Sequence, residues 1–181
     1  IYVVPKYEQP NPFQFNKIIV PTTSFIVYTS ILQWCSDVNK PVLFVGESGT
    51  AKTVTIKSFL EDLDDKKNIR LNINFSSRTK GNDVYVNLDN CVDKRTSNVF
   101  GPQAGKTLNM FIDDMSMPKI DLYGTQQPAA FLLTMLSRNA FYSKEKDLEM
   151  RTLRDVKYFA ATAPPGGGRN SIDPRLIACF N

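Results

Sequence analysis

The sequence predicts an α/β fold in which a parallel sheet is flanked by helices on both faces. Two observations support this prediction: short apolar segments have the length of buried strands, and helical patterns lie between them. Strands that alternate with helices favour a parallel sheet, because each crossover helix returns the chain to the same end of the sheet. A hydrophobic content of 42% and a charged content of 22% are ordinary for a globular domain.

The expected elements follow one another along the chain. Strands are expected over residues 41–46, 69–75, 107–113 and 156–163, and helices over 23–38, from Lys52 onward, over 79–95 and over 128–139. Thr22 or Thr23 suits the N-cap of the first helix, and Pro128 suits the first turn of the last. Residues 141–155 are expected to form an exposed segment outside the main sheet, and a hairpin is one structure that suits it. We expect residues 1–22 to be an extended lead-in and residues 23–181 to be one α/β domain, incomplete at its C-terminus.

One segment is similar to a phosphate-binding loop. "FVGESGTAKTVTI", residues 44–56, matches G-x-x-x-x-G-K-[ST] except that Ala51 replaces the second glycine. A strand precedes the loop and a helix follows it, so backbone N–H groups and the helix dipole converge on one point. The residues expected to contact nucleotide are Gly46, Glu47, Ser48, Gly49, Thr50, Ala51, Lys52, Thr53 and Val54.

A second segment, "GPQAGKT" (residues 101–107), keeps an intact Gly-Lys-Thr. It is one residue short between its glycines and it leads into a strand rather than a helix. Its glycines and proline are those of an ordinary turn. The first segment is therefore the better phosphate-binding candidate, and the alternative for it is a glycine-bearing turn with an exposed lysine.

Ala51 is expected to have ordinary helical angles, because the residue before the lysine begins the helix. Gly46 and Gly49 keep the positions where the backbone turns sharply. On this interpretation the alanine lowers nucleotide affinity without abolishing it. Lys52 neutralises the β and γ phosphates, and Thr53 helps to hold Mg²⁺.

Two further segments offer polar groups at strand ends. "MFIDD" ends in Asp113, which is placed to reach Mg²⁺ through water, and Asp114, which is placed to orient an attacking water. The last strand leads into "APPGGGRN", where the glycines permit close backbone approach and Asn170 is expected to meet the γ-phosphate or the water. A polar turn after the one strand and a flexible glycine loop after the other are the alternatives.

Composition excludes several other chemistries. The chain has no histidine, which excludes histidine-based catalytic triads and histidine zinc sites within it. Its three cysteines are far apart, which fits reduced, mostly buried thiols of a cytosolic compartment. The net charge of +4 is modest and the lysines are mixed with acids, so no nucleic-acid partner is expected. No apolar run reaches the roughly 20 residues that span a bilayer, so no membrane partner is expected.

Taken together, these segments resemble a AAA+ ATPase module of a dynein heavy chain, most closely the third module of an axonemal one. The motifs that carry the resemblance are "VPT" (20–22), "GESGTAKTVTI" (46–56), "INFSSRT" (73–79), "DKRTSNVFGP" (93–102), "FIDDMSMP" (111–118), "YGTQQP" (123–128) and "PPGGGRNSIDPRL" (164–176). The resemblance implies the large α/β subdomain of a P-loop NTPase. It also implies a ring of six modules that moves on microtubules and drives ciliary beating.

The resemblance further implies that the third module binds ATP or ADP with Mg²⁺ and hydrolyses ATP as a regulator. The implied partners are the other modules of the ring, microtubules, and dynein intermediate and light chains. The implied location is the cytoplasm and cytoskeleton, in the axoneme of a cilium or flagellum. On this resemblance the chain ends before the last core strand and the helical lid of the module.

The resemblance assigns the functional residues of the family's motifs to matching positions of this chain. Lys52 and Thr53 match Walker A, Asp113 matches Walker B, and Asn170 matches sensor 1. The resemblance places Val20 and Pro21 near the adenine. It makes Arg175 the arginine that acts in trans on a neighbouring module.

One departure from the family bears on catalysis. Most AAA+ proteins have glutamate where this chain has Asp114, which is one methylene shorter. Because a displacement of about 1 Å costs roughly a hundredfold in rate, slow turnover is expected.

Three functions fit these observations: a regulatory ATPase module, a nucleotide-binding allosteric module without useful turnover, and an unrelated P-loop enzyme such as a small-molecule kinase. The third is disfavoured because no acceptor-site residues accompany the loop. The 181-residue chain alone is expected to show no multiple-turnover ATPase activity.

Overall fold

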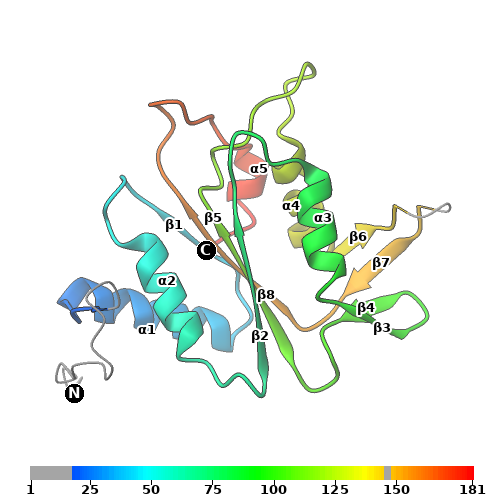
Figure 1. Ribbon diagram of the computed structural model, residues 1–181, viewed down its shortest axis with the longest axis horizontal. Coiled ribbons are helices and arrows are strands. Elements are labelled where there is room, and N and C mark those ends of the chain that lie inside the picture. The colour runs from blue at the N-terminus through cyan, green and yellow to red at the C-terminus, as the bar shows by residue number, and fades with distance from the viewer. Residues whose placement is uncertain (1–17, 145–147) are drawn as a thin grey trace.

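A parallel sheet forms the centre of the molecule, as expected. The computed structural model describes residues 18–144 and 148–181, and in this part of the chain the sheet has the strand order β1-β8-β5-β2 (Figure 1). The strands are β1 (Val42–Val45), β2 (Asn68–Asn74), β5 (Thr107–Asp113) and β8 (Val156–Thr162). Strand β8 pairs with β1 on one side and with β5 on the other, and every pairing is parallel. All carboxyl ends therefore meet at one edge.

Helices cover both faces of this sheet. Helices α1 (Thr23–Asp37) and α2 (Lys52–Glu61) lie on one face, and α3 (Gly81–Asp89) and α4 (Gln127–Arg138) lie on the other (Figure 1). A short helix, α5 (Pro174–Ile177), follows near the C-terminus. Thr22 is the N-cap of α1, and its Oγ1 accepts a hydrogen bond from the N–H of Phe25 at 3.3 Å. This confirms the expected start of the first helix.

Alternation of side chains along the strands divides the core into two layers. Phe111 and Phe159 point to the α1–α2 face, where they pack with buried residues of both helices. Their strand neighbours Met110, Ile112 and Ala160 point to the α3–α4 face. Because both faces are covered, β5 and β8 are mostly apolar rather than alternating, which is why they were recognisable in the sequence.

A second, smaller sheet was not expected. Within the described residues its order is β3-β4-β7-β6. Its strands are β3 (Asp93–Thr96), β4 (Val99–Gly101), β6 (Ala140–Tyr142) and β7 (Met150–Leu153). Strands β6 and β7 are antiparallel, which confirms the suggested hairpin.

Helix α3 is shorter than expected. The expected helix covered residues 79–95, but α3 ends at Asp89 and the chain enters β3 at Asp93. The physical reason is a long-range one: β3 pairs with β4, which in turn pairs with β7. This pairing outweighs the local helical pattern of a segment that reads "DKRT".

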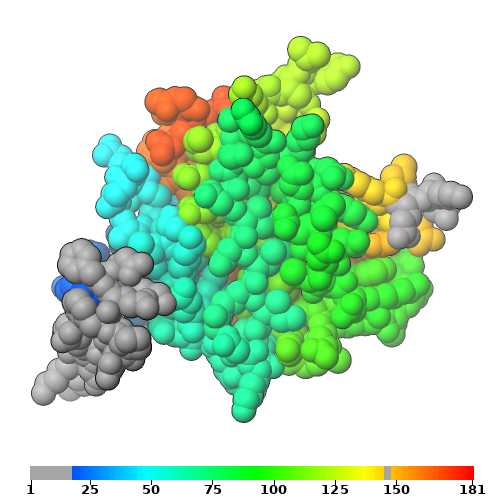
Figure 2. Space-filling view, in the orientation of Figure 1, coloured from blue at the N-terminus to red at the C-terminus, as the bar shows by residue number. Residues whose placement is uncertain are grey.

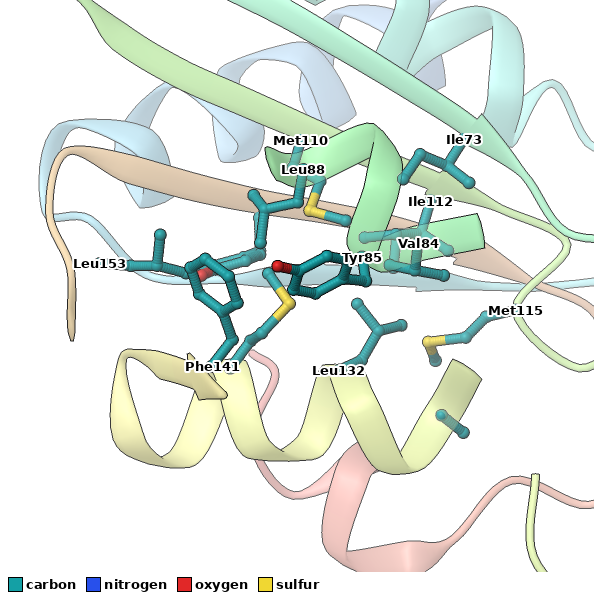
Figure 3. Close-up of a cluster of buried hydrophobic side chains, with 14 of the residues drawn as sticks. Ile73, Val84, Tyr85, Leu88, Met110, Ile112, Met115, Leu132, Phe141 and Leu153 are labelled. Atoms are coloured by element: carbon teal, nitrogen blue, oxygen red, sulfur yellow. The ribbon is translucent and has the colours of Figure 1, made fainter. Parts of the chain in front are cut away.

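An aromatic cluster joins the second sheet to helices α3 and α4. Phe141 of β6 is fully buried, and its ring centroid lies 5.8 Å from that of Tyr85 and 6.4 Å from those of Phe100 and Phe131. Figure 3 shows Phe141 and Tyr85 together among aliphatic side chains from α3, α4 and the central sheet. The guanidinium of Arg151 lies over the Phe100 ring at 4.6 Å. The cluster therefore fixes the hairpin to the main domain.

We predict that Phe141→Ala lowers the free energy of unfolding by about 3–5 kcal/mol, because it removes a buried ring and leaves a cavity. Equilibrium urea denaturation measures this. Leu122→Ala is the control: Leu122 is fully exposed, and surface substitutions of this kind change stability by less than about 0.5 kcal/mol. Equal effects of the two substitutions would contradict the assignment of this cluster to the core.

Candidate functional site

A cavity of about 240 Å³ lies at the carboxyl edge of the main sheet. Its walls are residues 48–54 of the loop and helix after β1, Asp113 and Asp114 at the end of β5, residues 161–163 at the end of β8, and Arg169. In Figure 2 the cyan surface of the loop after β1 lies beside the orange surface of the loop after β8. The sheet thus brings three segments that are distant in the sequence to one site.

The side chain of Lys52 lies inside the loop. Its Nζ donates hydrogen bonds to the carbonyl oxygens of Gly46 at 2.7 Å and Glu47 at 2.6 Å, and to Thr50 Oγ1 at 3.2 Å. Helix α2 begins at Lys52, so the free N–H groups of its first turn lie at the same place as the ammonium. A positive charge and a helix N-terminus together form an anion-binding arrangement.

The expectation that Ala51 has helical angles is wrong. Its φ is 59° and its ψ is 13°, in the left-handed region. Ala51 is the N-cap of α2: its carbonyl accepts the N–H of Thr55 at 2.9 Å, while its own backbone completes the turn begun at Gly49, where φ is 83°. The chain must reverse between Gly49 and Lys52, and this reversal requires positive φ at both ends. This explains why glycine is the usual residue at this position.

Gly46 is closely surrounded by side chains. A Cβ there would lie 3.1 Å from Thr50 Oγ1, which would have to shift slightly, and at an ordinary contact distance of 3.7 Å from a side-chain carbon of Lys52. The turn that needs positive φ is at Gly49 rather than at Gly46.

The loop and the end of β5 are joined by a hydrogen bond. Thr53 Oγ1 donates to Asp113 Oδ1 at 3.0 Å, although the two residues are 60 positions apart. The same Oδ1 accepts the N–H of Asp114 at 3.1 Å. The hydroxyl and carboxylate oxygens are the hard donors that Mg²⁺ prefers, and Mg²⁺ keeps waters and phosphate oxygens as its other ligands. Thr53 and Asp113 therefore fit Mg²⁺ held together with a phosphate.

The described residues contain no larger cluster of metal ligands that would compete with Thr53 and Asp113. Among residues 18–144 and 148–181, no group of three or more His, Cys, Asp or Glu side chains could hold a metal ion. The three cysteines are free thiols, each half-buried rather than mostly buried as expected.

Comparison with known proteins agrees with this geometry. A family model described as the P-loop containing dynein motor region matches residues 7–181. The chain belongs to this family.

Curated relatives cover almost the whole chain. The chain is 47% identical over 175 residues to Dynein-1-alpha heavy chain, flagellar inner arm I1 complex, of Chlamydomonas reinhardtii, with 97% of this chain and 4% of the relative aligned. It is 44% identical over 179 residues to human dynein axonemal heavy chain 10, with 99% of this chain and 4% of the relative aligned. It is 42% identical over 169 residues to rat dynein axonemal heavy chain 12, with 93% of this chain and 5% of the relative aligned. The chain thus spans a small part of each relative's length.

In this dynein motor segment, the loop after β8 is shaped by three glycines. Gly166, Gly167 and Gly168 have φ values of 129°, 58° and 85°, which residues with a side chain rarely adopt. The turn closes with an antiparallel bridge between Gly166 and Arg169. It returns the chain to the cavity at Arg169, a residue for which the sequence motifs predicted no role.

The side chain of Asn170, the expected sensor 1 residue, is hydrogen-bonded outside the cavity. Its Nδ2 donates to the carbonyl of Pro118 at 2.9 Å, and its N–H donates to the carbonyl of Ser116 at 3.0 Å. The side chain does not line the cavity. A contact between Asn170 and a γ-phosphate stays a prediction, and in this structure the residue anchors the glycine turn to the segment after β5.

Arg175 also lies apart from the cavity. It is in α5, it pairs with Asp173 at 2.9 Å, and 79% of its side chain is exposed. Hydrogen bonds from the side chain and backbone of Arg175 hold the pKa of the Asp173 carboxyl below its usual range. The expected role of Arg175 in trans stays a prediction.

The remaining expected contacts lie on the α1 side of the loop. Pro21 lines an apolar hollow on α1 with Ile26 and Trp34, and neither Val20 nor Pro21 borders the 240 Å³ cavity. A separate hollow of about 410 Å³ lies between α1 and the loop and shares Thr50 and Lys52 with the cavity. The role of Val20 and Pro21 near an adenine stays a prediction.

The rival segment 101–107 is far from this site. Lys106 closes a turn by donating its N–H to Gln103, at the amino end of β5, whereas Asp113 and the cavity are at the carboxyl end. Within the described residues no helix is long and apolar enough to cross a membrane.

We predict that Ala51→Gly raises the free energy of unfolding by about 0.5–1 kcal/mol. A left-handed residue with a side chain costs about 1–2 kcal/mol, and glycine gives back about 0.4–1 kcal/mol through the greater freedom of the unfolded chain. Equilibrium urea denaturation measures the change.

The control for this prediction is Ala130→Gly, at an exposed position inside α4. There the same substitution should lower stability by about 1 kcal/mol. Destabilisation of similar size at both positions would show that Ala51 is not in a left-handed conformation.

Proposed function

We propose that the chain is a nucleotide-binding AAA+ module of an axonemal dynein heavy chain, a microtubule motor, and that it binds ATP or ADP with Mg²⁺ and hydrolyses ATP slowly as a regulatory module. The observation that carries the proposal is the hydrogen bond from Thr53 to Asp113 beside the Lys52 ammonium. A cation, a helix N-terminus and two oxygen atoms that suit Mg²⁺ thus lie around one cavity, which supports the proposal. The order of motifs along the chain supports the third module of the ring.

Binding would use groups that are already in position. The first N–H groups of α2 and the Lys52 ammonium would contact the phosphates, with Lys52 exchanging its carbonyl partners for phosphate oxygens. Thr53 and Asp113 would hold Mg²⁺, which neutralises charge on the phosphates when bound. Asp114 would accept a hydrogen bond from the attacking water and orient it.

The rest of the heavy chain supplies the partners in this proposal. They are the neighbouring modules of the ring, microtubules, and dynein intermediate and light chains, in the axoneme of a cilium or flagellum. The named relatives are axonemal or flagellar heavy chains. Arg175, exposed on α5, would act in trans at the nucleotide site of a neighbouring module.

A second candidate is a module that holds nucleotide without useful turnover. Asp114 favours it, because this side chain is one methylene shorter than the usual glutamate. Asn170 favours it too, because its amide is bound to the Pro118 carbonyl rather than directed into the cavity.

We predict that Lys52→Ala weakens ATP binding about tenfold to a hundredfold in a motor ring that contains this module, with the other nucleotide sites disabled. Loss of a charge-assisted contact costs about 1.5–3 kcal/mol. Isothermal titration calorimetry with ATP and Mg²⁺ measures it. Lys106→Ala is the matched control and should leave affinity unchanged, because Lys106 is at the opposite edge of the sheet. If Lys106→Ala lowers ATP affinity and Lys52→Ala does not, the phosphate binds at residues 101–107 rather than at the loop after β1, and the assignment is wrong.

We predict that Asp114→Asn lowers single-turnover ATP hydrolysis in the same ring by about a hundredfold or more, since a positioned proton acceptor contributes about 10²–10⁴ in rate. ATP affinity should change little. Asp93→Asn, at an exposed position on β3, is the control for removal of one carboxylate. If the unsubstituted module binds ATP but hydrolyses it no faster than Asp114→Asn, the second candidate is the correct one.

A further inference from the structure

The side chain of Arg169 has no partner in the part of the chain that the structure describes. Its Nε is buried and has no hydrogen-bond acceptor, and the guanidinium makes no ion pair there. Its backbone, in contrast, is bonded in both directions to Gly166. A buried donor without an acceptor costs free energy, and a ligand oxygen in the cavity would supply the acceptor that Nε lacks.

The surroundings of Arg169 indicate which ligand fits. It lines the same cavity as Lys52, Thr53, Asp113 and Asp114. Of these, Lys52 is bonded to loop oxygens, and Asp113 is bonded to Thr53 and to the N–H of Asp114. Among the cations that line this cavity in the described residues, Arg169 is the one whose side-chain N–H groups have no protein acceptor. A planar guanidinium offers a fork of N–H donors that matches two oxygens of a phosphate.

The strand order indicates which phosphate it meets. The loop after β1 and the N-terminus of α2 form one wall of the cavity, and Asp113, Asp114 and Arg169 come from the neighbouring β5 and β8 ends. We expect a nucleoside triphosphate bound along the loop to bring its terminal phosphate toward Asp113, Asp114 and Arg169, which line the same cavity. A diphosphate lacks that terminal group.

The turn that carries Arg169 is fixed at both ends. Before it, Gly166–Gly168 have positive φ and the bridge to Gly166 closes the loop. After it, both the backbone and the side chain of Asn170 are bonded to the segment after β5. The position of Arg169 is therefore set by the backbone before any ligand binds.

We propose that Arg169 binds the terminal phosphate of a nucleoside triphosphate in cis and so makes the site discriminate between triphosphate and diphosphate. The inference rests on the proposed nucleotide-binding function. It assigns to Arg169, from its own module, a γ-phosphate contact that is separate from the expected sensor Asn170 and from Arg175 acting in trans.

The test compares two probes, ADP and the β,γ-imido analogue of ATP, each with Mg²⁺, in a motor ring that contains this module with the other sites disabled. Calorimetry should show that Arg169→Ala weakens the triphosphate analogue about tenfold to a hundredfold and ADP less than about threefold. Arg169→Lys should recover part of the loss, because it restores the charge without the fork. Retained ADP binding shows that each variant is folded.

Two further variants separate the possible failures. Arg154→Ala, an exposed arginine just before β8, removes one positive charge away from the cavity and should change neither affinity. Lys52→Ala should weaken both probes. If Lys52→Ala does so while Arg169→Ala changes neither probe, or changes both equally, the role of Arg169 is refuted and nucleotide binding stands. If Lys52→Ala changes neither probe, the nucleotide site and the role of Arg169 are both refuted.

Discussion

The position of β8 between β1 and β5 is the constraint on which the site depends. The parallel register pairs Val45 with Thr162 and Ile112 with Ala160, so the loops that follow the three strands leave the sheet side by side. This register brings together the loop after β1, the carboxylates of Asp113 and Asp114, and the turn formed by Gly166–Gly168. The hydrogen bond between Thr53 and Asp113 then joins the first turn of α2 to the end of β5. Ligands of open α/β sheets bind at this carboxyl edge.

Part of the backbone strain in the described residues lies at the same edge. Ala51 and Asp114 both have positive φ although neither is glycine, and three glycines with positive φ precede Arg169. Such conformations cost free energy and persist only when the surrounding structure enforces them. The two core layers on either side of the sheet provide that support, since Phe111, Ile112 and Ala160, just behind the cavity, are almost completely buried. A rigid sheet thus holds a strained, polar rim, which is the arrangement that a pre-organised binding site needs.

The fold was predictable where local pattern and tertiary context agree. The central strands β5 and β8 are mostly apolar because both faces are covered, whereas β2 alternates polar and apolar residues; the cap at Thr22 is a local feature. The second sheet was not predictable, because β3 is polar and its pairing with β4 gives it its structure.

The site was predictable as a set of residue types, but not in its geometry. The angles of Ala51 follow from a turn that a motif does not describe, and Asn170 is turned away by Pro118, which is 52 residues distant. The location of Arg169 at the cavity could not be predicted, because it depends on the conformation of the three glycines before it and not on a sequence motif.

We propose that one Mg²⁺-bound nucleotide lies across the carboxyl ends of β1, β8 and β5. A structure of a motor ring that contains this module, determined with Mg²⁺ and a non-hydrolysable ATP analogue, tests this proposal most directly. We expect phosphate density against the N-terminus of α2, metal density between Thr53 and Asp113, and the terminal phosphate beside Arg169. Nucleotide density at the turn of residues 101–107, or a module without nucleotide while its neighbours are filled, would contradict it.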